Sequence, residues 1–259
     1  MSETWLVRET ERPAATLDLY CFPPAGGTSG LYRNWHAALP EFVQLHAIEL
    51  PGRERRFSET PFDNMGLLLD ELVPVIEASR SPGRPFVLFG HSMGASIAFE
   101  MTRRLCETNR ELPALLCISG RKAPQTPERF SFMHDLGEAE FIEGLRAYGG
   151  TPEAVLQNED LMELFVPLLR ADFSLFETWS YTPQPPLRVP FVVFGGEDDH
   201  RALRDELQSW RIHTALDFQL RMLPGGHFFL RDDEERMLAE LGQVLLSYAD
   251  LKQADVLAG

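Results

Sequence analysis

A serine, a histidine and a pair of carboxylates occupy positions from which they could together carry out nucleophilic catalysis. Ser92 lies in the pentapeptide GHSMG, residues 90–94, and His227 follows two glycines near the carboxyl end of the chain. Asp198 and Asp199 stand between them in the run GGEDDH. A serine nucleophile needs a base within hydrogen-bond reach, and the base needs a carboxylate to orient it. The order serine, acid, histidine is the one found in hydrolases with a G-x-S-x-G turn.

The residues around Ser92 support more than a chance match. Three fixed positions would recur accidentally in roughly one chain in a dozen of this length. Here an apolar run, 86–89, precedes the turn, and helix-forming residues continue from Ala95 without a Gly or Pro breaker. Strand, tight turn and helix are the elements that hold a serine at the tip of a sheet. We therefore predict that Ser92 is a nucleophile.

The base and the acid are assigned by their places in the chain. His227 comes directly after the last predicted strand, in a Gly-rich loop that can carry it over Ser92. The other histidines precede the nucleophile, lie within its turn, in or beside a helix, in the expected lid or beside the acid: His36, His46, His91, His134, His200 and His213. Asp198 and Asp199 both follow the strand at 191–194, where a parallel sheet gathers its site residues. Spacing leaves the choice between these two open.

Backbone N–H groups are expected to hold the oxyanion of a tetrahedral intermediate. One is the N–H of Met93, directly after the nucleophile. The other should come from the loop CFPPAGG, 21–27, after the first predicted strand. Because its two prolines have no N–H, Ala25 supplies the first free donor.

Strands and helices alternate along most of the chain, which predicts an α/β fold with a mostly parallel sheet covered on both faces. Strands are expected at 17–22, 44–50, 86–89, 114–119, 191–194 and 218–223, and helices at 31–39, 65–79, 95–108, 203–212 and 234–249. Residues 123–186 interrupt this rhythm with helices only, at 139–148 and 159–178. We expect 1–122 and 187–259 to form the core and 123–186 to form a helical lid over an apolar chamber.

Composition excludes several classes of function. The 259 residues carry a formal net charge of −15, which argues against nucleic acid and anionic membranes as partners. The amino terminus has no apolar leader and no run approaches membrane-spanning length, so we expect a cytoplasmic protein. The three cysteines, Cys21, Cys106 and Cys117, show no metal-ligand spacing and are expected to be reduced core residues. We expect a monomer.

Several segments together resemble the type II thioesterases, editing hydrolases of polyketide and nonribosomal peptide synthesis with the α/β-hydrolase fold. The resemblance rests on CFPPAGGTSGLYRNW, IELPGRERRFSE, FGHSMGASIAFE, FGGEDDH, LPGGHFFL and the long insertion segment AYGGTPEAVLQNEDLMELFVPLLRADFSLFETW. They span residues 20–230. The family places its acid directly before the position of His200, which favours Asp199. Pro24 departs from the histidine or tyrosine that many relatives have there.

The resemblance implies hydrolysis of acyl thioesters on the phosphopantetheine arm of acyl or peptidyl carrier protein domains, which frees a blocked synthase. No metal or redox cofactor is expected, and the phosphopantetheine is carried by the partner. Carrier proteins are generally acidic, so Arg53, Arg55, Arg56, Arg121 and Lys122 could form a docking rim, although solvated arginines are at least as good an explanation. Alternatives are a general serine esterase or acyltransferase, a releasing thioesterase from the end of a synthase, and an inactive binding module.

Overall fold

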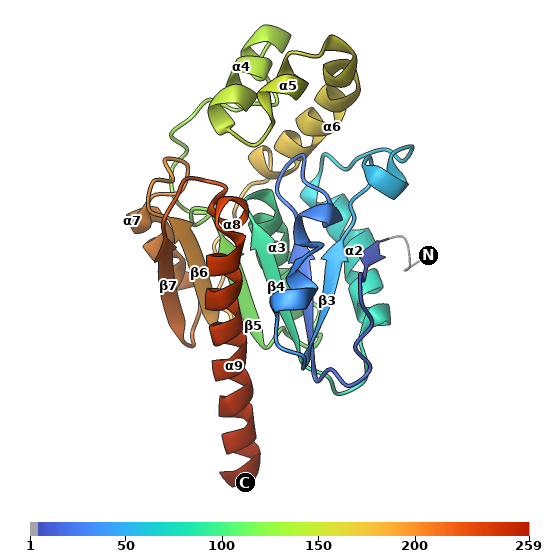
Figure 1. Cartoon of the computed structure of the whole chain (residues 1–259). Helices are drawn as coiled ribbons and strands as arrows, with labels where there is room; N and C mark the ends of the chain where they lie inside the picture. Colours follow the sequence, from blue (N-terminus) through green and yellow to red (C-terminus); the bar gives the residue numbers. More distant parts are fainter. Residues whose placement is uncertain (1–4, 259) are drawn as a thin grey trace.

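The protein, described here from a computed structural model, is defined over residues 5–258, with side chains up to residue 249. Its described residues form a seven-stranded sheet in the order β1-β3-β2-β4-β5-β6-β7 (Figure 1). All neighbouring strands pair in parallel except β1, which runs antiparallel to β3. The strands are β1 (Leu6–Val7), β2 (Leu17–Phe22), β3 (Val43–Ile48), β4 (Phe86–His91), β5 (Leu115–Ser119), β6 (Phe191–Gly196) and β7 (Phe218–Leu223).

Helices cover both faces of this sheet and a further group stands beyond its carboxyl edge (Figure 1). The α-helices are α1 (Trp35–Ala38), α2 (Met65–Ser79), α3 (Met93–Glu107), α4 (Glu138–Tyr148), α5 (Glu153–Leu156), α6 (Glu159–Glu177), α7 (Arg204–Gln208), α8 (Phe229–Asp232) and α9 (Glu234–Ala258). Short 3-10 turns lie at η2 (Ser29–Tyr32), η3 (Glu54–Arg56) and η4 (Ser209–His213).

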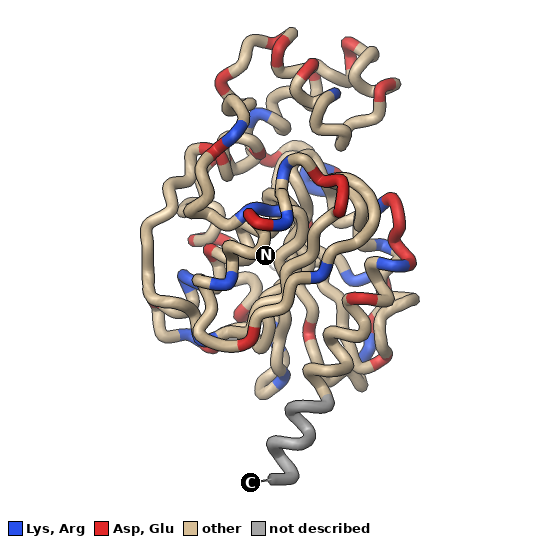
Figure 2. The backbone as a smooth tube through the Cα atoms, turned by 90° about the vertical axis from the view of Figure 1, so that its left-hand side faces the viewer, with Lys and Arg blue, Asp and Glu red and all other residues tan. Residues whose placement is uncertain are grey.

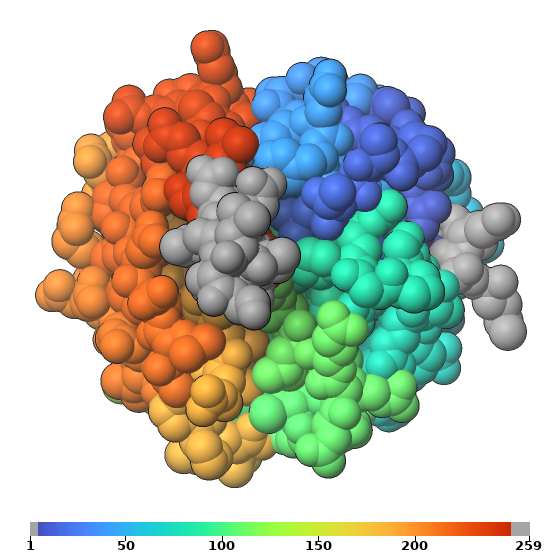
Figure 3. All heavy atoms as spheres, turned by 90° about the horizontal axis from the view of Figure 1, so that it is seen from below, coloured from blue at the N-terminus to red at the C-terminus, as the bar shows by residue number. Residues whose placement is uncertain are grey.

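Each central strand is buried on both sides because successive side chains enter different cores. In β4, Phe86 and Leu88 pack with α2 and α3, whereas Val87 and Phe89 pack with α1 and α9. A strand buried on both faces is a continuous apolar run, as 86–89 is in the sequence. Seen from the end opposite α4–α6, the segment after 187 fills one side of the molecule and adjoins the amino-terminal part along one edge (Figure 3). In the sheet order β4 is the central strand, so its carboxyl end lies in the middle of the sheet edge.

The expected strands all form, and the differences concern short or interrupted elements. Strand β1, with two residues, and helix α5, with four, are too short to show a period. The helices expected at 31–39 and 203–212 are each divided, into η2 and α1 and into α7 and η4. Cys21 and Cys117 are buried, but Cys106 is exposed, so its predicted place in the core was wrong.

Helices α4, α5 and α6 of the 123–186 segment stand over the carboxyl edge of the sheet (Figure 1). Asn158 caps α6 by accepting the N–H of Leu161 at 3.1 Å. Leu169 and Phe173 of α6 belong to the same apolar cluster as α2 and α3, whereas Leu164 on the opposite face is exposed. The segment is therefore packed onto the core through one face of α6. Its opening as a lid stays a prediction.

Candidate active site

Ser92 lies on a strained turn between β4 and α3. Its backbone has φ 53° and ψ −115°, a conformation that non-glycine residues rarely adopt. A Cβ on Gly90 would lie 2.1 Å from the carbonyl oxygen of Gly94, and one on Gly94 would lie 2.1 Å from that of Phe22. Both positions therefore require glycine. The Ser92 N–H donates to the Ser119 carbonyl at 2.8 Å, which ties the turn to β5.

The predicted base and acid meet Ser92 in one hydrogen-bonded chain. His227 Nε2 lies 3.0 Å from Ser92 Oγ, and His227 Nδ1 lies 2.9 Å from Asp199 Oδ2. Asp199 is buried, and its other oxygen accepts the N–H groups of Arg201 and Ala202 at 2.8 and 3.3 Å. Asp198, the alternative acid, is exposed to solvent. The geometry required of nucleophile, base and orienting carboxylate is present with Asp199.

The two predicted oxyanion donors lie on adjoining backbone. Phe22 pairs with Gly90 in the sheet, so the loop after β2 begins beside the Ser92 turn. Within the described chain, the N–H groups of Ala25 and Met93 donate to no protein acceptor. Met93 is also the first residue of α3, where the helix dipole favours negative charge. This arrangement can hold a developing oxyanion next to Ser92.

A buried ring, His91, and a half-buried ring, Tyr148, pack against His227. The His91 ring centroid lies 5.2 Å from that of His227, and its Nδ1 lies 2.9 Å from Ser119 Oγ. Burial, followed by the His227 charge, holds the pKa of His91 well below its usual value, so His91 stays neutral. The Tyr148 ring meets His227 edge-on at 5.4 Å, and burial raises the pKa of its hydroxyl. Both neighbours are uncharged at neutral pH.

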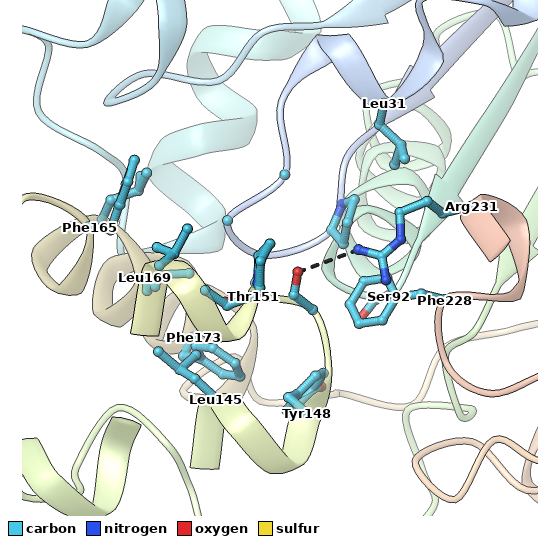
Figure 4. Close-up of a pocket in the computed structure, with 18 residues that line it drawn as sticks. Leu31, Ser92, Leu145, Tyr148, Thr151, Phe165, Leu169, Phe173, Phe228 and Arg231 are labelled. Atoms are coloured by element: carbon cyan, nitrogen blue, oxygen red, sulfur yellow. Dashed lines mark hydrogen bonds between the residues drawn. The ribbon is translucent and has the colours of Figure 1, made fainter. Parts of the chain in front are cut away.

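A mostly apolar chamber of about 270 Å³ opens beside Ser92 (Figure 4). Its walls come from α4–α6, from the loop after β2 and from the residues around α8. Ala25, Leu145, Tyr148, Val155, Leu169 and Phe173 are among the lining residues. Arg231 adds a charge to this lining, stacks 4.8 Å over Phe228 and donates to the Gly150 carbonyl at 3.5 Å. Helices α4–α6 thus roof an apolar space next to the hydroxyl of Ser92.

Most of the five basic residues considered for a docking rim are neither free nor fully solvated. Arg53 is buried in an ion pair with Asp172 of α6, at 2.7 Å. Arg56 and Lys122 are also buried and bind Glu59 and Glu128, and Arg121 stacks on Phe176 at 4.6 Å, leaving Arg55 exposed. Acidic positions predominate on the α4–α6 segment in the charge view (Figure 2). An acidic partner would therefore meet few free cations on that segment.

Sequence reasoning missed Tyr148, Asp172 and Arg231 as neighbours of the site. Tyr148 and Asp172 lie within the long insertion segment that carries the family resemblance, but the segment gave no reason to single them out.

Several excluded histidines have structural partners, such as Asp18 for His46 and Glu177 for His134. No three His, Cys, Asp or Glu side chains of the described chain are grouped as metal ligands. No described helix is both long and apolar enough to cross a membrane.

Comparison with known proteins gives this geometry a family. The family model of the thioesterase domain matches residues 18–244 of this chain. Linear gramicidin dehydrogenase LgrE of Brevibacillus parabrevis is 36% identical over 94% of this chain and 93% of its own. Gramicidin S biosynthesis protein GrsT of Aneurinibacillus migulanus is 37% identical over 90% of this chain and 91% of its own. The type II thioesterase BorB from the borrelidin biosynthetic cluster is 34% identical, covers 94% of this chain and 98% of its own, and superposes with a TM-score of 0.82. The chain belongs to the thioesterase family, and it is a hydrolase that acts on thioesters.

Proposed function

We propose that this protein removes stalled or misprimed acyl groups from the phosphopantetheine arm of carrier proteins, with Ser92 as its nucleophile. The observation that carries the proposal is the chain Ser92–His227–Asp199 at the wall of an apolar chamber. The chamber can shield an acyl chain while its carbonyl lies at Ser92. The family relatives from peptide and polyketide pathways support a carrier-bound substrate.

The reaction proceeds in two displacements. Ser92 Oγ forms a bond to the thioester carbonyl carbon while His227 Nε2 takes its proton, and Asp199 stabilises the resulting imidazolium. The N–H groups of Ala25 and Met93 hold the oxyanion. When the C–S bond breaks, His227 gives the proton to the leaving thiolate. Water, deprotonated by the same His227, then attacks the acyl-Ser92 ester and releases a carboxylic acid. These steps use no metal or redox cofactor.

The side chains around Ser92 suit hydrolysis better than the dehydrogenase activity in the name of LgrE. A hydroxyl, an imidazole and a carboxylate transfer protons and acyl groups, whereas a dehydrogenase must hold a hydride acceptor.

The chamber volume of about 270 Å³ lies near the roughly 300 Å³ lower end of ligand pockets. We therefore propose short to medium acyl groups as substrates.

Hydrolysis of acyl-carrier protein tests the proposal. Acetyl-, butyryl- and octanoyl-carrier protein are compared with the same acyl groups on N-acetylcysteamine and on p-nitrophenol, for the wild type and Ser92→Ala. The proposal expects a preference for the carrier-bound thioester and its loss in the variant. Equal or faster turnover of the p-nitrophenyl esters, with none of the carrier, would instead identify a general esterase. Activity that depends on an added alcohol or amine acceptor would identify an acyltransferase.

A further inference from the structure

The oxyanion donor Ala25 lies in a tight turn of the backbone. The N–H of Gly27 donates to the carbonyl of Pro24 at 2.9 Å, which closes a four-residue turn with Ala25 and Gly26 at its centre. Gly26 has φ +69°, whereas Ala25 has no positive φ. This combination defines a type II turn, in which the central peptide bond is rotated by about 180° relative to type I. The direction of the Gly26 N–H therefore reports which turn is present.

A buried carboxylate of α6 receives that N–H. Asp172 Oδ2 accepts from Gly26 at 2.7 Å, and the same carboxylate forms a two-bond ion pair with Arg53, at 2.7 and 3.0 Å. Arg53 also donates to the Gly27 carbonyl at 3.0 Å. Asp172 and Arg53 are 2% and 3% exposed, respectively, so water does not compete for these bonds.

Apolar contact from the same helix adds to this attachment. A Cβ on Gly26 would lie 2.6 Å from Leu169 Cδ2, so the backbone of the turn rests directly against α6. One turn of helix further on lies Asp172. The catalytic turn is thus held by one face of a helix that also roofs the chamber.

We propose that Asp172, oriented by Arg53, is a positioning residue that sets the oxyanion donor Ala25 and so makes catalysis depend on the seating of α6. The proposal rests on the roles proposed above for Ser92 and Ala25. If the central peptide flipped to the type I form, the Ala25 carbonyl would face the Asp172 carboxylate, and the two acceptors would repel each other. That flip would turn the Ala25 carbonyl and the Gly26 N–H, whereas the Ala25 N–H belongs to the preceding peptide bond. The carboxylate therefore acts on the donor by selecting the type II turn and holding it against α6. If α6 lifts from the core, the 24–27 turn loses this partner, and the position of the Ala25 N–H is no longer held by it.

Two variants test the coupling, with one matched control. Asp172→Asn keeps the shape but places an NH₂ group against either Gly26 N–H or the Arg53 guanidinium. Arg53→Lys keeps the charge but loses the planar fork that orients the carboxylate. The control is Glu177→Gln, because Glu177 lies on the same helix and accepts the backbone N–H groups of Met133 and His134 at 2.9 and 3.0 Å. Thermal unfolding verifies that each variant folds, and Arg53→Lys carries the test if Asp172→Asn does not fold.

The readout separates transition-state from ground-state binding. A trifluoromethyl ketone analogue of the acyl thioester adds Ser92 to form a hemiketal oxyanion, whereas the matching thioether without a carbonyl only occupies the chamber. We expect Asp172→Asn to lower kcat by about 10²-fold with a small change in KM. Displacing the donor N–H should have nearly the same effect on kcat as removing one oxyanion-hole donor. In Asp172→Asn, ketone affinity should fall by the same factor, whereas thioether affinity should stay within about twofold. The kcat and ketone affinity of Arg53→Lys should lie between those of Asp172→Asn and those of the wild type.

Other outcomes overturn the proposal. Unchanged kcat and ketone affinity in both variants would show that Asp172 does not set the donor. Equal weakening of ketone and thioether, or an equal loss in Glu177→Gln, would show a role in stability alone. Ser92→Ala is measured in parallel: if it retains full turnover, the proposed function fails, whatever the Asp172 variants do.

Discussion

Asp199→Asn tests the catalytic chain most directly, because the structure indicates which hydrogen bonds survive the change. The asparagine oxygen can still accept the N–H groups of Arg201 and Ala202, which Asp199 Oδ1 receives at 2.8 and 3.3 Å. Its NH₂ group then faces His227 Nδ1, where the carboxylate oxygen lies at 2.9 Å. Because that NH₂ group is a donor, the neutral imidazole must carry its proton on Nε2. In this tautomer His227 cannot accept the proton of Ser92.

The expected loss is large although the fold is retained. An orienting aspartate replaced by asparagine lowers kcat by about 10⁴-fold in Ser-His-Asp enzymes, which corresponds to about 5.5 kcal/mol of transition-state stabilisation. Asp198→Asn is the matched control, because Asp198 is the adjacent carboxylate and is exposed. We expect its kcat to stay within about twofold of the wild type, as for surface substitutions away from the site.

The assay follows thiol release from acetyl-N-acetylcysteamine and from acetyl-carrier protein, with thermal unfolding as a measure of folding. Asp199→Asn should unfold close to the wild-type temperature and still bind the thioether analogue, since the chamber is untouched. The reasoning is refuted if Asp199→Asn retains more than about a tenth of wild-type kcat, or if Asp198→Asn loses as much. In the second case the acid would have been assigned to the wrong residue.

Two further predictions concern the chamber and a buried histidine. Val155→Phe adds a ring to the chamber wall and should lower octanoyl turnover at least about tenfold relative to acetyl turnover, whereas Leu164→Phe, on the exposed face of α6, should not; equal loss on both acyl groups would contradict this. Burial, and secondarily the charge of Arg103, lowers the pKa of His213 to about 4. Only the unfolded chain then binds a proton between about pH 6.5 and 4, so up to about 3 kcal/mol of stability should be lost as pH falls through this window. Urea unfolding at pH 7.5 and 4.5 should show a smaller loss in His213→Phe than in the wild type, and an equal loss would argue against the assignment.

Much of the core and of the Ser92–His227–Asp199 chain could be predicted along the sequence, because many of the features that specify them are local. An apolar run, a G-x-S-x-G turn and helix formers each act through neighbours in the chain, so 86–107 predicted strand, turn and helix correctly. The glycines at 90 and 94 belong to the same local signal, since the turn admits no side chain there. The order serine, acid, histidine then followed from the alternation of strands and helices.

Other features depend on contacts between distant residues and have no local signal. Asp198 and Asp199 are adjacent and chemically identical, so spacing did not separate them and only the family resemblance favoured Asp199. The path of the loop after β6 buries Asp199 against His227, 28 positions away. Arg53 looked like a surface cation because nothing near it in sequence shows its partner, 119 positions away. Their separation also conceals the bond from Asp172 to Gly26.

The sequence by itself determined that a serine, a base and an acid stand at the ends of buried strands, because strand, turn and helix are specified by neighbouring residues. The spacing of Asp198 and Asp199 left the acid open, the family resemblance favoured Asp199, and the tertiary structure places Asp199 at His227. Only the tertiary structure decided which arginine leaves the surface and how α6 and the 24–27 turn meet beside Ser92. Those outcomes arise from close packing and from the burial of charges in pairs, and both depend on segments that the fold alone brings together.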